Sequence, residues 1–94
     1  MDIARSDIVK AAAGRDKGKL FFVMDMEEDF LLLADGKTRK LERPKRKKRK
    51  HTAFLARSES RTAGKIRSGE KLTNSELRRT LAQFSGEGNP DQEG

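Results

Sequence analysis

Few residues of this 94-residue chain have the types and spacing that catalysis or metal binding requires. The only histidine, His51, follows six consecutive basic residues, whose field disfavours its protonated form, whereas a nearby phosphate would favour that form. A metal site would need further ligands grouped with this histidine, and the chain has no cysteine. His51 is therefore expected to be a surface contact to a binding partner rather than a catalyst.

The carboxylates Asp25, Glu27, Glu28 and Asp29 are the other candidates for chemistry. They could form a carboxylate pair or a metal-binding loop, but the spacing of a calcium loop is absent, and acids between strands usually form solvated turns. The glycine pair at Gly14–Gly18 resembles no P-loop, because no Lys-Ser/Thr pair follows the second glycine. We expect no enzyme activity, metal, cofactor or small-molecule substrate.

Two groups of cations carry the stronger signal. The segment KTRKLERPKRKKRK, Lys37–Lys50, holds ten of the 22 Lys and Arg residues and a single acid, Glu42, so it accounts for the net charge of +7. A block of positive charge of this density suits a phosphate backbone. By itself it is also compatible with a solvated tail or a localisation address.

The second group lies in the loop GRDKGK, whose two glycines indicate positive φ or a close backbone approach. Its cations Arg15, Lys17 and Lys19, together with loop amides, could bind phosphate, although a plain charged turn is the competing interpretation. If the strands form a small barrel, this loop and the arm Arg39–Lys50 would lie on one rim and could clamp the same phosphate backbone. Only the part from Arg43 onward is expected to be a mobile arm.

The elements that must position these groups are mostly strands. Short apolar and aromatic runs predict strands over Ile8–Ala13, Leu20–Met26 and Phe30–Ala34, and a weaker one over Thr52–Leu55. The pair Asp35-Gly36 predicts a two-residue hairpin turn, with Thr38–Leu41 as the returning strand that ends before Pro44. Such spacing favours a strongly bent antiparallel sheet or barrel.

The remainder of the chain is more polar. Residues 56–71 are expected to be a flexible linker and residues 86–94 a disordered tail. Between them, Thr73 and Glu76 have the spacing of a capping box and predict a short helix over about 74–84. Its stripe of Leu77, Leu81 and Phe84 would dock on the core, or else contact a second copy or a protein partner.

Neither apolar run, 20–24 or 30–34, approaches the length of about 20 residues that a membrane helix needs. The first ten residues carry early acids and no apolar segment typical of a signal peptide. The absence of cysteine fits a reducing compartment. A soluble, cytoplasmic protein is expected.

The order DIVKAAAGRDKGKLFFVMDM resembles the KOW motif, and FLLLADGKTRKLERPKRKKRKH resembles the small bacterial KOW-domain RNA-binding proteins. These are similar to a large-subunit ribosomal protein family of archaea and eukaryotes. The resemblance covers about residues 5–55 and implies an SH3-like barrel whose loops bind RNA, often in a ribosome. The chain departs from the archaeal and eukaryotic relatives after about Lys50, so no fixed ribosomal position is implied.

The predicted protein is therefore mainly β, with an SH3-like barrel over 1–55 that includes a basic arm over 43–51, and a capped helix over 72–85. Its expected partner is structured RNA, most of all ribosomal RNA, since most of its five phenylalanines are needed in the core. The alternative is a protein–protein module that contacts RNA polymerase or a ribosomal protein or factor. The residues expected to shape the glycine loop are Gly14, Asp16 and Gly18, and those expected to contact RNA are Arg15, Lys17, Lys19, Lys37, Arg39, Lys40, Arg43, Lys45, Arg46, Lys47, Lys48, Arg49, Lys50 and His51.

Overall fold

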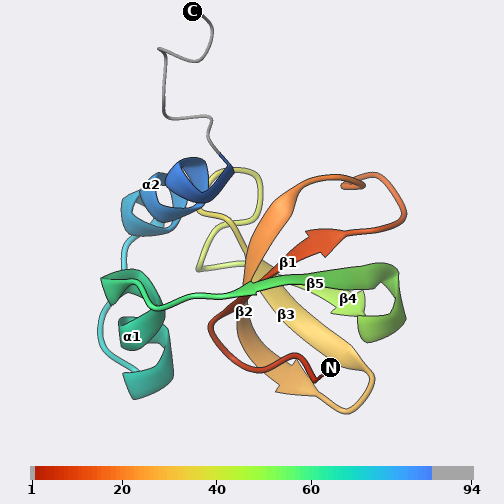
Figure 1. Cartoon of the computed structure of the whole chain (residues 1–94), viewed down its shortest axis with the longest axis horizontal. Helices are drawn as coiled ribbons and strands as arrows, with labels where there is room; N and C mark the ends of the chain where they lie inside the picture. Colours follow the sequence, from red (N-terminus) through yellow and green to blue (C-terminus); the bar gives the residue numbers. More distant parts are fainter. Residues whose placement is uncertain (1, 86–94) are drawn as a thin grey trace, which may run out of the picture.

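A computed structural model describes residues 2–85. Five antiparallel strands form one bent sheet in the order β4-β3-β2-β1-β5, and two helices pack on one side of it (Figure 1). The elements are β1 Asp7–Ala11, β2 Leu20–Glu27, β3 Phe30–Ala34, β4 Lys45–Lys48, the short 3-10 helix η1 Arg49–His51, β5 Thr52–Arg57, α1 Arg61–Ser68 and α2 Asn74–Ser85. The mainly β class is thus confirmed, but the sheet is not closed.

Both faces of the sheet are covered, which explains the unbroken apolar runs in the sequence. In β2, Phe21 and Val23 belong to a cluster on one face that also includes Leu31 and Leu33 of β3. Phe22, between them, points to the other face and packs with residues of α1 and α2. Successive strand residues point to opposite faces, so a strand buried on both sides needs no polar alternation.

Four of the predicted strands are confirmed with small changes at their ends: β1, β2, β3 and β5. The predicted strand over Thr38–Leu41 is wrong. Asp35 closes a local turn instead, because its carboxylate Oδ1 accepts hydrogen bonds from the backbone N–H groups of Lys37 and Arg39, at 2.9 and 2.8 Å. An aspartate that satisfies the backbone in this way competes with a two-residue hairpin.

The strand that returns beside β3 is β4, which lies inside the basic run. Lys45 pairs with Leu33 and Lys48 pairs with Phe30, so the chain needs ten residues, 35–44, to make the connection. The prediction of a mobile arm from Arg43 onward is therefore wrong for residues 45–48. Lysine and arginine tolerate such an edge position because their aliphatic stems cover apolar surface while their charged ends stay in water.

Residues 56–71, predicted as a flexible linker, contain the end of β5 and the whole of α1. The side chain of Ser60 caps α1 by accepting a hydrogen bond from the N–H of Ala63 at 3.1 Å, and Gly69 ends the helix in the left-handed conformation. Ala63 and Ile66 are buried against the sheet. These signals are short, and eight residues with only two buried apolar side chains give little periodicity to detect.

The predicted C-terminal helix and its capping box are confirmed in α2. Thr73 and Glu76 exchange hydrogen bonds, from the Thr73 N–H to Glu76 Oε1 at 2.9 Å and from the Glu76 N–H to Thr73 Oγ1 at 3.2 Å. Leu77 and Leu81 are buried against the sheet, as expected for docking. The predicted disordered tail, 86–94, lies outside the described residues. Neither helix in residues 2–85 is long and apolar enough to span a membrane.

Candidate nucleic-acid interface

The loop between β1 and β2 is closed by its own backbone. The Gly18 N–H donates to Ala11 O at 2.8 Å, and the Lys19 N–H donates to Asp16 O at 2.9 Å. Gly14 and Gly18 have φ values of 85° and 91°, which is the first of the two alternatives that the sequence indicates for them. The side chains of Arg15 and Lys17 are exposed on this loop. The backbone therefore fixes the loop while it presents its cations to solvent.

Asp16 is the exception in this loop because its side chain is buried, with 4% of the residue exposed. Its Oδ2 accepts hydrogen bonds from Nε and Nη2 of Arg39 at 3.3 and 3.0 Å, and Lys19 Nζ lies 3.6 Å from Oδ1. Burial would raise the pKa of Asp16, but the hydrogen bonds and charge of Arg39 and the charge of Lys19 outweigh it, so the pKa is lowered below 3.8. Arg39 is thus used to hold the glycine loop against the 35–44 connection.

The cations of β4 alternate between two environments. Lys45 and Lys47 are paired with Leu33 and Leu31, which places them on the same side of the sheet as those core residues, and both are half-buried. The ammonium group of Lys47 reaches the glycine loop, where a Cβ added to Gly14 would lie 3.4 Å from Nζ. The structure therefore brings together the loop and the basic run that the sequence placed on one rim.

On the other side of β4, Arg46 is occupied within the fold. Its Nε donates to Glu27 Oε1 at 2.8 Å, and its guanidinium carbon lies 3.6 Å from the centroid of the Phe30 ring. Lys48, the next residue on this side, is exposed and has no ion pair within residues 2–85. Arg46 thus stabilises the packing of β4 on the β2–β3 hairpin, and Lys48 remains available for a ligand.

The short helix η1 continues the basic run between two neighbours. The Arg49 N–H donates to Asp29 O at 2.7 Å, and His51 O accepts from the Ala12 N–H at 2.8 Å. His51 is half-buried at this junction, whereas Lys50 is exposed. These backbone contacts fix η1 between the β2–β3 turn and Ala12, which lies just before the glycine loop. We call the glycine loop, β4 and η1, residues 14–19 and 45–51, the basic region.

The basic region has nine Lys and Arg side chains and one carboxylate, Asp16. Two of the arginines have neighbours within the fold, Arg46 as described and Arg49, whose Nη2 lies 3.8 Å from Met26 Sδ. Lys19 makes the longer contact with Asp16. The cations that make no ion pair or side-chain hydrogen bond within residues 2–85 are Arg15, Lys17, Lys45, Lys47, Lys48 and Lys50.

The remaining predicted contacts, Lys37, Lys40 and Arg43, lie on the 35–44 connection, which is attached to the first turns of α2. Asn74 accepts a hydrogen bond from the Leu41 N–H at 2.8 Å and donates to Glu42 Oε1 at 3.1 Å. Arg78 Nη1 donates to Gly36 O at 2.7 Å. Lys37 and Lys40 are therefore held toward α2, beside a groove that the sequence did not predict.

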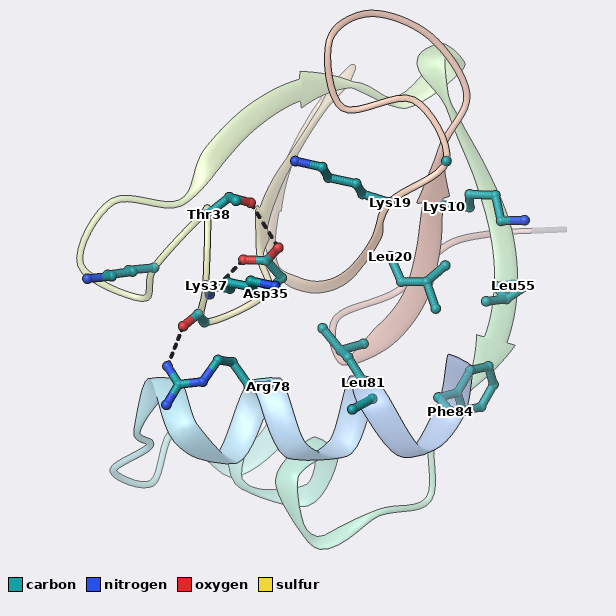
Figure 2. A pocket seen from close by; sticks show the side chains of 14 residues that line it. Lys10, Lys19, Leu20, Asp35, Lys37, Thr38, Leu55, Arg78, Leu81 and Phe84 are labelled. Carbon is teal, nitrogen blue, oxygen red and sulfur yellow. Dashed lines mark hydrogen bonds between the residues drawn. The ribbon is translucent and has the colours of Figure 1, made fainter. Parts of the chain in front are cut away.

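This groove, of about 1000 Å³, runs between α2 and the strand ends (Figure 2). Leu20 and Leu81 lie at its middle, and Leu55 lies over Phe84 at one end. Its charged lining consists of five cations and one acid, Asp35, whose carboxylate is hydrogen-bonded to its own turn. The lining cations are Lys10, Lys19, Lys37, Lys40 and Arg78.

Lys10, Leu55 and Arg78 are groove residues that sequence reasoning missed, whereas Phe84 belongs to the helical stripe that it assigned to the core or to a partner. Leu77 and Leu81 are buried on the sheet, but Phe84, which continues the same stripe, leaves 44% of its surface exposed. The helical spacing in the sequence places all three residues on one face of α2. It does not show that the sheet covers only the first two. Lys10 is a lone cation inside the apolar run of β1, which indicates an exposed position. It does not indicate a groove.

The carboxylates considered for catalysis remain dispersed at the end of the β2–β3 hairpin. Glu27 pairs with Arg46, and Asp25 Oδ1 accepts from the Met26 N–H at 2.8 Å. All four acids are exposed. Among residues 2–85, no three histidines, cysteines or acids are grouped closely enough to hold a metal ion.

Comparison with known proteins gives no assignment: no protein-family model matches the chain, and no curated protein is significantly similar to it.

Proposed function

We propose that this chain is a non-enzymatic, cytoplasmic RNA-binding protein that contacts structured RNA, most of all ribosomal RNA, through its basic region. The observation that carries the proposal is the position of Lys47, whose ammonium group lies against Gly14. This contact joins the two groups of cations into one surface. Phosphate oxygens are the complementary ligand, and a surface of Lys and Arg positions a phosphate backbone without reading its sequence.

Double-stranded RNA suits this surface because it is recognised mainly through shape, phosphates and 2′-hydroxyl groups. Few phenylalanine rings are accessible for stacking with RNA bases. Phe21 and Phe22 are buried, and Phe54 packs against the core. A fourth, Phe30, lies under Arg46. The basic region thus offers charge rather than aromatic rings.

The resemblance to KOW proteins supports the same proposal and suggests a variant of the SH3-like barrel. In keeping with this, β1 pairs with both β2 and β5, and the bent sheet surrounds the cluster that contains Val9, Phe21 and Leu33. The resemblance implies a barrel whose loops bind RNA, and the exposure of Arg15 and Lys17 on the glycine loop agrees with that.

The test is a titration of the full chain with a ribosomal RNA fragment at several salt concentrations. If the six unpaired cations each engage a phosphate, a plot of log K against log salt has a slope of about −4 to −5. The double variant Lys48→Gln/Lys50→Gln should reduce the magnitude of that slope by about 1.5–2. A slope near zero for the natural chain would rule out the proposed mechanism.

The matched control is Arg61→Gln/Lys71→Gln, which removes the same charge from exposed residues at the helical side of the molecule. It should leave the slope close to that of the natural chain. If both double variants have the same effect, binding depends on net charge alone and not on the basic region.

The second candidate is a protein–protein module that contacts RNA polymerase or a ribosomal factor. The helical stripe considered for that role is largely internal, because Leu77 and Leu81 are buried. The observation in its favour is that two exposed apolar residues, Leu55 and Phe84, line one end of the groove.

A further inference from the structure

We propose that the groove between α2 and the strand ends binds an unpaired nucleotide of the same RNA, with its base against Phe84 and Leu55. This inference rests on the proposed function and adds a second subsite to it. The basic region would hold a paired segment, and the groove would accept a bulged or looped-out base next to that segment.

The chemistry of the groove is that of a nucleotide site. Phe84 and Leu55 leave 44% and 39% of their surfaces exposed, and they lie together at one end of the groove (Figure 2). An exposed aromatic ring offers a stacking surface to any base, because every base has a π face.

The charges around this surface are mainly positive, with five cations and one acid. Lys10 and Lys19 lie on the side of the groove opposite α2. Lys37 and Lys40 line the groove from the 35–44 connection. The carboxylate of Asp35 is turned to its own loop, where it accepts from Lys37 N, Thr38 Oγ1 and Arg39 N. A ligand with an apolar, planar part and negative charge on either side fits this arrangement, and a nucleotide with its two flanking phosphates has that form.

Continuity with the basic region favours RNA over an acidic peptide. Gly18 and Lys19 belong to the glycine loop and also line the groove. A phosphate backbone bound along Arg15 and Lys17 therefore needs to continue past only Lys19 to reach the groove. The nucleotide in the groove would then be a neighbour of the nucleotides on the basic region.

The test compares two RNA hairpins that differ only in a single-nucleotide bulge in the stem, each titrated against the full chain by fluorescence anisotropy. The natural chain should bind the bulged hairpin about 5-fold or more tightly than the paired one, as expected for one base stacked on a ring. Phe84→Ala should abolish this preference and change the affinity for the paired hairpin less than 2-fold. Phe84→Trp should retain the preference.

Met26→Ala is the matched control, since Met26 is similarly exposed at 38% but lies on the β2–β3 hairpin outside the groove. Because Met26 Sδ lies 3.8 Å from Arg49 Nη2 in the basic region, this variant can change the affinity for both hairpins alike, but it should keep the preference for the bulged one. Circular dichroism of all three variants should match that of the natural chain, because neither Phe84 nor Met26 is buried.

The outcomes separate the two proposals. Equal affinity of the natural chain for both hairpins, or an equal loss on both in Phe84→Ala, would overturn the nucleotide site and leave the basic region intact. That result would instead fit a groove for an acidic, apolar peptide. Failure to bind either hairpin would overturn RNA binding as a whole.

Discussion

Asp16 and Arg39 join two loops of this domain through a pair of hydrogen bonds from the guanidinium group to one carboxylate oxygen, at 3.3 and 3.0 Å. Asp16 belongs to the glycine loop, and Arg39 belongs to the connection that is attached to α2. The pair therefore determines how the basic region and the groove lie relative to one another. Arg39, which the sequence suggested as an RNA contact, also holds the loops in place.

Asp16→Asn should lower the free energy of unfolding by about 1–3 kcal/mol at pH 7, because it removes the charged acceptor of a buried hydrogen-bonded pair. The folded-state pKa of Asp16 lies below 3.8, so its contribution is complete above that pH and is lost as the pH falls through the folded value. Urea denaturation at pH 7, 5 and 3 should show the two proteins converging in stability at acid pH.

Glu27→Gln is the control for this change. It also removes a carboxylate from an arginine, but the side chains of Glu27 and Arg46 are 51% and 56% exposed. Solvent screening limits such a pair to less than about 1 kcal/mol. Equal destabilisation by the two variants at pH 7 would contradict the role assigned to the Asp16–Arg39 pair.

Gly36→Ala should destabilise the fold more than Gly18→Ala. Both glycines have positive φ, 78° and 91°, so each alanine meets a strain of about 1–2 kcal/mol. A Cβ at Gly36 would also collide with the carbonyl oxygen of Asn74 in α2, whereas a Cβ at Gly18 would meet nothing within 4 Å. That collision adds about 1–3 kcal/mol. Chemical denaturation of the two variants measures the difference, and equal values would refute the close approach of α2.

Leu77→Ala should cost about 2–5 kcal/mol of stability, because it leaves a cavity where α2 covers Phe22 and Ile8. Phe84→Ala, on the same helix, should cost about 0.5 kcal/mol or less, as is usual for an exposed side chain. Thermal unfolding followed by circular dichroism tests both. A large loss of stability in Phe84→Ala would show that its ring is packed.

Because α2 covers one face of the sheet, removal of the whole helix should unfold the domain. Point variants are therefore the better test of what the helix binds.

The backbone of β4 should be as rigid as that of β3 in the free protein. The strand pairs with β3 over four residues, and Arg46 is fixed by Glu27 and Phe30. NMR relaxation should give order parameters near 0.85 for Lys45–Lys48, whereas a mobile arm would give values below about 0.6. The neighbouring strand β3 serves as the internal reference.

The parts of the fold that the sequence predicted are those with an apolar pattern or a cap. The runs in β2 and β3 are long enough to indicate strands, and the Thr73–Glu76 capping box marks the start of α2. The helix α1 was missed, although Ser60 and Gly69 are ordinary start and stop signals that flank it. With only Ala63 and Ile66 buried near the middle, these signals had no hydrophobic stripe to support them.

The strand β4 shows why the sequence predicted the charge of the basic region but not its secondary structure. A run of six consecutive cations has no alternation of apolar and polar residues, so nothing in it indicates a strand. Its partner strand supplies the apolar face, with Leu31 opposite Lys47 and Leu33 opposite Lys45. The groove could not be predicted either, because it depends on where α2 crosses the sheet.

The pairing of β4 with β3 has a consequence for the thermodynamics of any complex that the basic run forms. A disordered run would have to lose about 1–2 kcal/mol of backbone entropy for each residue that becomes ordered on binding. In β4 this loss occurs when the domain folds, before any ligand arrives. Association can then proceed as the docking of a preformed surface, with a rate governed by electrostatic steering and with none of the heat-capacity change that accompanies coupled folding.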